Sequence, residues 1–277
     1  MSNRNRFFVH SFHNLESAEF SVQKYSRLKF GSDRAAREFG YELAIGFFNR
    51  HMTTLLSNKC VVIPSPYNYV RNAATIMTGH FCNKLNELLV NAQGAHVDCS
   101  LIHRKVSYTN DYGFMSKEQR KSLIDNDSFY LNKDFTDGKV LIFVDDIFIT
   151  GTHENKLAEI LRRDGIENKC FFVYYAQYQG TDNPEIEAAL NFSAVKNVND
   201  YIELTMERGH HIIVRPIKYI LSQDKDTLSQ LIKEVETDKL REIYHGCLGE
   251  GYYRIPAYQS NFKRIAKVLA DRDAAVA

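Results

Sequence analysis

The sequence lacks an excess of charge of either sign. Its 35 Lys and Arg residues stand against 34 Asp and Glu residues, for a formal net charge of +1. Without a global positive field, nucleic acid is a less favoured partner, and so is an anionic membrane. No apolar run approaches the length of a membrane-spanning helix, and residues 1–6 carry no hydrophobic segment of a secretion signal. We therefore expect a cytoplasmic protein with no membrane partner.

Cysteine is scarce and follows no pattern. The five cysteines lie far apart, and no two of them form a C-x-x-C pair. This spacing indicates neither a disulfide framework nor a zinc ribbon. Internal repeats, low-complexity tracts and proline-rich linkers are missing as well. We therefore expect the whole chain to pack as one compact, reduced body.

What the sequence does contain is a series of short apolar runs typical of strands buried on both faces of a parallel sheet. These runs are residues 60–63, 140–144 and 170–175, with a weaker, partly alternating one at 96–102. Apolar residues at helical spacing lie between them, at 70–94 and 153–164. Alternating strands and helices predict an α/β fold with a mainly parallel sheet flanked by helices.

Both flanks of this central region have helical patterns. One helix is expected at residues 32–50 before the first strand, and the others follow the last strand, near 199–207, 227–244 and 261–270. We expect three parts that pack together. They are an N-terminal hood or extension at 1–58, a core at 59–198 and a C-terminal helical extension at 199–277.

The segment that carries chemistry is residues 140–154. A buried strand delivers two adjacent carboxylates, Asp145 and Asp146, at its C-terminal end, and a Thr-Gly-Thr turn then leads into a helix. Ligands of an open α/β sheet bind beyond the carboxyl ends of the strands, and a helix N-terminus binds phosphate. Carboxylates beside such a site accept from ribose hydroxyls or hold Mg²⁺ through water. This order of residues favours a sugar phosphate as the ligand.

Other classes of protein with paired acidic residues fit this segment less well. Receiver domains of response regulators carry Asp-Asp near the start of the domain and have no Thr-Gly-Thr turn after it. Phosphatases of the haloacid-dehalogenase type need Asp-x-Asp, whereas Ile147 stands two positions after Asp145. A purely structural alternative is that Asp145 and Asp146 only cap the turn that follows them.

Residues 140–154 resemble the phosphoribosyl-pyrophosphate (PRPP) signature of the type I phosphoribosyltransferases. The branch that looks most similar is the ComF-like one, in which an Arg-containing, Asn-rich run precedes the signature as residues 116–120 and 126–129 do here. The Ile-Thr-Gly-Thr-His-Glu variant also resembles phosphoribosyltransferase-like proteins associated with tellurium resistance and stress. The resemblance covers roughly residues 59–198, with a fainter echo at 25–31, and it implies a type I phosphoribosyltransferase-like fold.

The resemblance also implies roles for particular residues. Asp145 and Asp146 would be catalytic: they would contact the ribose hydroxyls, stabilise positive charge on the sugar as pyrophosphate departs, and hold Mg²⁺ mostly through water. The 5′-phosphate would be bound by Thr150, Gly151, Thr152, His153 and Glu154. The pyrophosphate loop and a flap running from residue 104 to 116 would contribute Ser65, Pro66, Tyr67, Arg71, Arg104 and Lys105.

Two positions depart from the family pattern. Ile149 stands where 6-oxopurine transferases carry an Asp that acts on the base, which argues against hypoxanthine or guanine as the acceptor. His153 stands where the loop usually ends in Thr or Ser. An imidazole still donates to phosphate, and it gains charge near about pH 6.5.

The function expected from this resemblance is a pentosyl transfer. The phosphoribosyl group of Mg²⁺–PRPP would pass to an unidentified nitrogen acceptor, or to water, as pyrophosphate leaves. The alternative is a non-catalytic sensor or effector of a stress or defence system that binds PRPP or a nucleotide and acts through a protein or nucleic-acid partner. The family also implies a homodimer.

Two further groups of residues favour structural roles. His210 and His211 are adjacent, and neighbouring residues of a strand point to opposite faces, so the pair is poorly placed to hold one metal ion. The aromatic residues near the C-terminus are expected to pack the tail onto the core rather than to stack on a base. They are Tyr244, Tyr252, Tyr253, Tyr258 and Phe262.

Overall fold

The computed structural model describes residues 5–105, 128–180 and 185–276. Within these parts, a five-stranded sheet with the order β1-β7-β6-β2-β3 has every neighbouring pair parallel, and β4 and β5 form a separate antiparallel ribbon. The strands are β1 (Asn5–Phe12), β2 (Cys60–Pro64), β3 (Asp98–Cys99), β4 (His103–Lys105), β5 (Ser128–Tyr130), β6 (Val140–Phe148) and β7 (Cys170–Tyr178). The α/β fold with a mainly parallel sheet is therefore confirmed.

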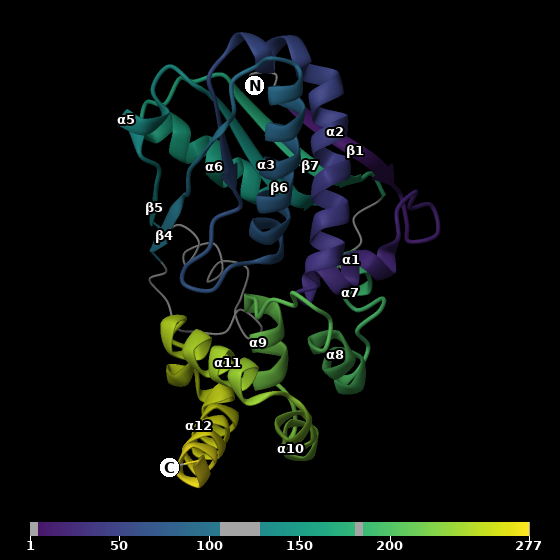
Figure 1. Ribbon diagram of the computed structural model, residues 1–277, viewed down its shortest axis with the longest axis vertical. Coiled ribbons are helices and arrows are strands. Elements are labelled where there is room, and N and C mark those ends of the chain that lie inside the picture. Colours follow the sequence, from purple (N-terminus) through teal and green to yellow (C-terminus); the bar gives the residue numbers. More distant parts are fainter. Residues whose placement is uncertain (1–4, 106–127, 181–184, 277) are drawn as a thin grey trace.

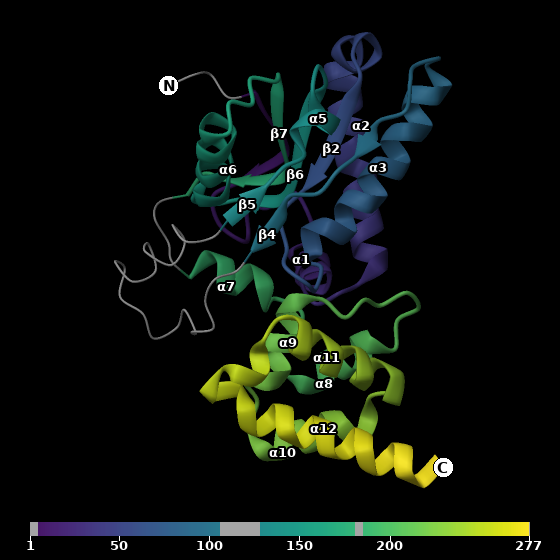
Figure 2. The ribbon, with the colours of Figure 1, turned by 90° about the vertical axis from the view of Figure 1, so that its left-hand side faces the viewer.

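Helices cover both faces of this sheet (Figure 2). One face is packed by α2 (Asp33–Ser57) and α3 (Ala73–Asn91), and α1 (Val22–Lys29) lies at the N-terminal end of α2. The other face is packed by α6 (Thr152–Arg163), and the short α5 (Lys133–Thr136) precedes β6.

The central strand β6 shows why its residues form a continuous apolar run. Leu141 and Phe143 pack in the cluster that contains α6, whereas Ile142 and Val144 pack in the cluster that contains α2 and α3. All four side chains are buried. Because successive side chains of a strand point to opposite faces, both faces of β6 must be apolar, and the alternation of a half-exposed strand is lost.

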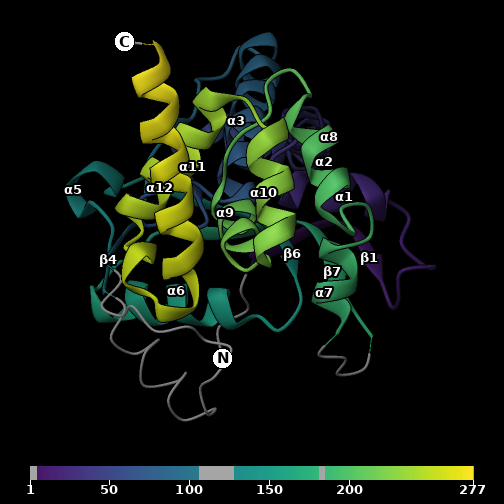
Figure 3. The same cartoon turned by 90° about the horizontal axis from the view of Figure 1, so that it is seen from below.

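The helices of the C-terminal half form a second group below the sheet (Figures 1 and 3). They are α8 (Val198–Thr205), α9 (Val214–Leu221), α10 (Lys225–Glu234), α11 (Thr237–Gly249), the 3₁₀ turn η2 (Tyr252–Arg254) and α12 (Pro256–Val276). The helix before them, α7 (Ile186–Asn191), packs in the main core through Ile186 and Leu190. From α8 onward they enclose a separate apolar core, to which Phe30 and Val70 contribute from the α/β part. Tyr252 and Tyr258 are buried in that core.

The N-terminal segment differs from the expected hood. Residues 5–12 form β1, which pairs in parallel with β7, with Phe7 opposite Val173. The helix α2 packs in the main core against the sheet. Residues 1–58 therefore do not form a separate extension as far as they are described. The strand was missed because β1 lies at the sheet edge, where the polar side chains of His10 and Ser11 break the apolar run.

Several expected helix and strand limits also shift. The helix expected at 227–244 is two helices, α10 and α11, and the segment 96–102 contributes only the two residues of β3.

His210 and His211 do not lie in a strand. The Nε2 atom of His211 is 2.9 Å from Oδ1 of Asp33, and the Nε2 atom of His210 is 2.9 Å from the carbonyl oxygen of Phe30. Both histidines thus help attach the C-terminal part to the α/β part.

Among the residues that the structure describes, none of the helices combines the length and apolarity that crossing a lipid bilayer requires.

Candidate functional site

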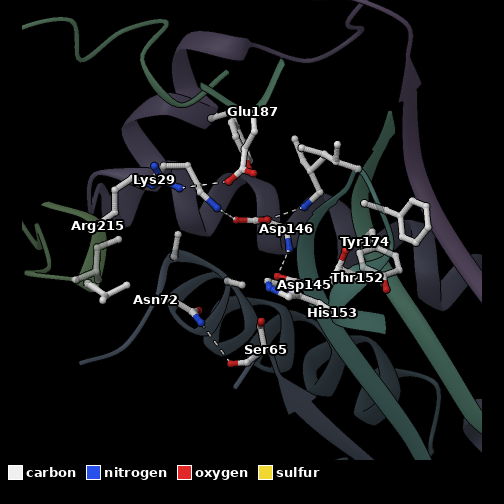
Figure 4. Close-up of a pocket in the computed structure, with 18 of the residues that line it drawn as sticks. Lys29, Ser65, Asn72, Asp145, Asp146, Thr152, His153, Tyr174, Glu187 and Arg215 are labelled. Atoms are coloured by element: carbon white, nitrogen blue, oxygen red, sulfur yellow. Dashed lines mark hydrogen bonds and ion pairs between the residues drawn. The ribbon is translucent and has the colours of Figure 1, made fainter. Parts of the chain in front are cut away.

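A cavity of about 660 Å³ lies where the sheet meets the C-terminal helices (Figure 4). One wall is the C-terminal end of β6, the loop that follows it and the first turn of α6, with Ser65 and the start of α3 beside them. Its opposite wall comes from α1, α7 and α9. The cavity therefore lies beyond the carboxyl ends of parallel strands, which is where open α/β sheets bind ligands.

Asp146 is a buried carboxylate with an ionic partner. It is 7% exposed, its Oδ1 accepts from the backbone N–H of Ile147 at 2.7 Å, and its Oδ2 forms an ion pair with the ammonium group of Lys29. Burial by itself raises the pKa of Asp146, but the charge of Lys29 and its hydrogen bond outweigh burial and hold the pKa below its usual range. Asp146 is therefore ionised at neutral pH.

Asp145 lies beside it at the more open edge of the cavity. Its Oδ1 accepts from the backbone N–H of Asp146 at 2.9 Å, and its Oδ2 is 3.4 Å from Nδ1 of His153. This contact raises the pKa of His153 above its usual value, because the negative charge of Asp145 favours the imidazolium. The His153 side chain is 80% exposed. It therefore stands at the mouth of the cavity rather than within its wall.

The loop after β6 leads directly into α6, and the N-terminus of this helix lines the cavity. Gly151 is the N-cap of α6, with a φ of +70°, and it has no side chain to cap the helix. The hydroxyls of Thr150 and Thr152 lie 2.9 Å apart, and the helical ladder begins with the N–H of Asn155 bonding to the carbonyl of Gly151. Backbone amides and hydroxyls at such a position are suited to an anion.

Glu154, which was expected to bind the 5′-phosphate, lines the cavity, but its carboxylate is engaged by other side chains. Its carboxylate is 1% exposed and accepts from Arg6 at 2.8 to 3.1 Å and from the hydroxyl of Tyr174 at 3.1 Å. Because Glu154 lies two residues into α6, its side chain turns toward β1 and β7 instead of the loop. The carboxylate is a structural group that anchors the start of the helix.

The predicted pyrophosphate residues are only partly brought together. Ser65 lines the cavity and is buried, with its N–H bonded to the carbonyl of Val144. Pro66, Tyr67 and Arg71 follow in the same loop but do not line this cavity. The carbonyl of Arg71 instead accepts from the backbone of α9.

The flap lies outside the described residues. Arg104 and Lys105 belong to β4 by their backbone, but their side chains are outside the described part. The rest of the flap, 106–116, and the Arg-containing run 116–120 are outside it as well.

Several cavity residues were not expected from the sequence. Lys29 and Tyr25 come from α1, Asn72 is the N-cap of α3, and Glu187 and Arg215 come from α7 and α9. The only sequence signal among them was the faint family echo at 25–31, which contains Tyr25 and Lys29. Helices far apart in the chain supply the rest, so no local motif joins them.

The carboxylate pair is the feature of the cavity that suits a divalent cation. Within the described parts of the chain, no group of three or more His, Cys, Asp or Glu side chains is placed to hold a metal ion. Asp145 and Asp146 offer two adjacent carboxylates, which fit a Mg²⁺ ion that keeps most of its water and is shared with a phosphate ligand. The donor set therefore fits a substrate-borne Mg²⁺ rather than a closed metal cage.

The cavity lies at the edge of the sheet where α/β proteins bind ligands, and comparison with known proteins gives the family. The model of the family "PRTase ComF-like" matches residues 4–265, so the chain belongs to the ComF-like phosphoribosyltransferase family. This confirms the type I phosphoribosyltransferase resemblance drawn from residues 140–154. The match also includes the N-terminal strand and most of the C-terminal helices.

Two other comparisons add little to this assignment. A solved structure of a hypoxanthine phosphoribosyltransferase from Staphylococcus aureus matches at 8% identity with a TM-score of 0.33, covering 53% of this chain and 70% of that one. A search of curated protein sequences found no match.

Proposed function

We propose that this protein binds Mg²⁺–PRPP in the cavity and transfers its phosphoribosyl group to a nitrogen acceptor with release of pyrophosphate. The observation that carries the proposal is one continuous arrangement. Asp145 and Asp146 at the end of β6 and the N-terminus of α6 at Thr152 line the same cavity, only a short loop apart. A ribose 5-phosphate carries hydroxyls and a phosphate on one molecule, so it offers one group to each of these two parts of the cavity.

The reaction would break the bond between C1 of the ribose and the pyrophosphate oxygen. The electron pair of that bond leaves with the pyrophosphate, the acceptor nitrogen supplies the pair for the new bond to C1, and its proton passes to a base or to water. Positive charge develops on the ribose in between. The carboxylates of Asp145 and Asp146 stabilise that charge, and Lys29 keeps Asp146 ionised for this role.

Three groups would position PRPP before the reaction. The Thr-Gly-Thr loop and the first turn of α6 would bind the 5′-phosphate, while Asp145 and Asp146 would accept from the ribose hydroxyls. The same two carboxylates would hold Mg²⁺ through its water, and the ion would neutralise charge on the pyrophosphate.

The acceptor side of the cavity is aromatic and apolar in part. Phe192 and Tyr219 line it, with ring centroids 6.2 Å apart, and Ile149, which also lines the cavity, is the first residue of the loop after β6. A flat nitrogen heterocycle fits such a wall. Ile149 supplies no base, which favours the second candidate, a sensor that binds PRPP without transfer.

Thermal unfolding with and without millimolar PRPP and Mg²⁺ tests the binding step. A ligand at about 100 times its Kd adds about 2.7 kcal/mol of stability. We expect the wild type to shift and Asp145→Asn/Asp146→Asn to lose the shift, while Asp271→Asn, on α12 and away from the cavity, keeps it. No shift in the wild type would contradict the proposal.

Release of pyrophosphate across a panel of nitrogen heterocycles then separates the two candidates. Turnover with one acceptor would identify a transferase. Binding of PRPP without turnover on any member would indicate the sensor.

A further inference from the structure

The described Lys and Arg side chains that line the cavity come from helices that the sequence analysis did not assign to the pyrophosphate site. Among the described residues that line the cavity, the Lys and Arg side chains are Lys29, Arg215 and Lys218, all from α1 and α9. Arg71, which was expected to bind pyrophosphate, does not line it. A pyrophosphate carries several negative charges, so its site needs positive partners.

Lys29 is held deep in the cavity. Its side chain is 15% exposed, its ammonium group is paired with Oδ2 of Asp146, and it lies 5.5 Å from the centre of the Tyr25 ring. An ammonium group has three donors, and the pair with Asp146 uses one direction. Lys29 therefore has donors for a second anion beside Asp146.

Arg215 approaches the same carboxylate from α9. It forms an ion pair of 3.5 Å with Glu187, whose side chain is 60% exposed, and its own side chain is 31% exposed. Its positive charge adds to that of Lys29 in lowering the pKa of Asp146. A long pair with a well-exposed partner is weak, so little is lost when the guanidinium turns to a stronger anion.

The chemistry of ribose decides which anion belongs there. In PRPP the pyrophosphate is attached to C1, next to the hydroxyl carbons, and the 5′-phosphate lies at the opposite end of the ring. Asp146 is the group expected at the hydroxyls, and Thr152 and His153 are near the 5′-phosphate site. Figure 4 shows Lys29, Arg215 and Glu187 gathered on one side of Asp146, and Thr152 and His153 on the other.

We infer that Lys29 and Arg215 form the pyrophosphate subsite of the cavity, so that α1 and α9 bind the leaving group. This rests on the proposed binding of PRPP. Lys29 is then shared between Asp146 and the pyrophosphate, and Arg215 closes the subsite from the C-terminal helices. The leaving group thereby joins the two parts of the protein.

Comparing two ligands within each variant tests this subsite. PRPP and ribose 5-phosphate differ in the group at C1, so the ratio of their Kd values cancels effects on folding, on the 5′-phosphate site and on the ribose hydroxyls that both ligands share. With Mg²⁺ present in both titrations, we expect the wild type to bind PRPP more tightly than ribose 5-phosphate. Lys29→Met and Arg215→Met should each reduce that preference by about tenfold or more, as expected for a lost charge-assisted hydrogen bond.

Two further variants serve as controls. Arg27→Met removes a cation of the same helix α1 that pairs with Glu207 outside the cavity, so it should leave the ratio unchanged. Lys29→Arg keeps a cation and should retain most of the preference.

The outcomes separate the two proposals. A wild type that binds neither ligand would overturn PRPP binding itself. A wild type that prefers PRPP, together with an unchanged ratio in Lys29→Met and Arg215→Met, would leave PRPP binding intact and overturn the subsite.

Discussion

Arg6 and Glu154 form a bidentate ion pair between the edge strand and the helix that opens into the cavity. Nε and one terminal nitrogen of Arg6 donate to the carboxylate of Glu154 at 2.8 to 3.1 Å, and Glu154 is 1% exposed. Because Glu154 lies in the first turn of α6, this pair ties β1 to the loop that is proposed to bind phosphate. The N-terminal strand thus supports the site without entering it.

Removing Arg6 alone is expected to destabilise the protein. Arg6→Met would remove the bidentate ionic partner of the buried Glu154 carboxylate, and breaking a buried ion pair by removing one partner costs about 3 kcal/mol. Chemical denaturation measures the change in the free energy of unfolding. The double variant Arg6→Met/Glu154→Gln should recover part of the loss, and a double variant less stable than Arg6→Met would contradict this account.

The pair of Lys29 and Asp146 predicts a pH dependence of stability. The folded-state pKa of Asp146 is lowered, so the pair contributes stability that is present above the unfolded pKa of about 4 and is lost as the pH falls through the folded value. Lys29→Met should therefore be less stable than the wild type at pH 7, by about 3 kcal/mol. The gap should narrow as the pH falls below about 4 toward the lowered folded pKa, because Asp146 then becomes protonated in the wild type as well.

Denaturant midpoints measured from pH 3 to pH 8 check this dependence. A gap between the wild type and Lys29→Met that stays constant over that range would show that the ion pair is not its cause.

The backbone conformation of the turn before α6 predicts that any side chain at Gly151 lowers the stability of the protein. Its φ of +70° is left-handed, and an added Cβ would lie 2.8 Å from the ring of Phe148. Gly151→Ala is expected to lose about 1–2 kcal/mol from backbone strain, and more if the ring must move. Gly79→Ala is the matched control, because a Cβ there meets nothing within 4 Å on an exposed face of α3. The control should gain about 0.5–1 kcal/mol from helix propensity.

Cys99 is expected to be the most reactive thiol among the described cysteines. Its Sγ lies 3.3 Å from that of the buried Cys82, and the hydrogen bond between the two thiols lowers the pKa of Cys99 to about 7. Burial raises the pKa of Cys60, Cys170 and Cys247. Iodoacetamide at pH 7, followed by mass spectrometry, should label Cys99 first, and Cys82→Ala should slow that labelling several-fold. Equal rates in the two proteins would exclude the hydrogen bond as the cause.

The local pattern of 140–154 was enough to predict the central strand, the helix after it and the family. A strand buried on both faces has a continuous apolar run, and a phosphate loop has a fixed order of residues, so both can be recognised within about fifteen positions. Edge strands give no such signal. β1 was missed because polar side chains such as His10 and Ser11 interrupt its apolar residues.

The role of Glu154 shows the limit of a motif. Its place in the sequence put it beside the phosphate loop, but the direction of a helical side chain depends on what packs around the helix. Arg6 lies 148 residues away in the chain and decides that direction. The sequence around either residue gives no indication that the two form an ion pair.

By itself, the sequence determined the α/β class, the acidic pair at the end of β6 and the turn into α6, because these depend on neighbours along the chain. The tertiary structure decided which charges meet these groups. Lys29 reaches Asp146 across 117 positions of sequence, and Arg215 reaches the same cavity from a helix of the C-terminal part. Such contacts arise only when separate helices pack against one sheet edge, since an ion pair depends on distance in space and leaves no fixed spacing in the sequence.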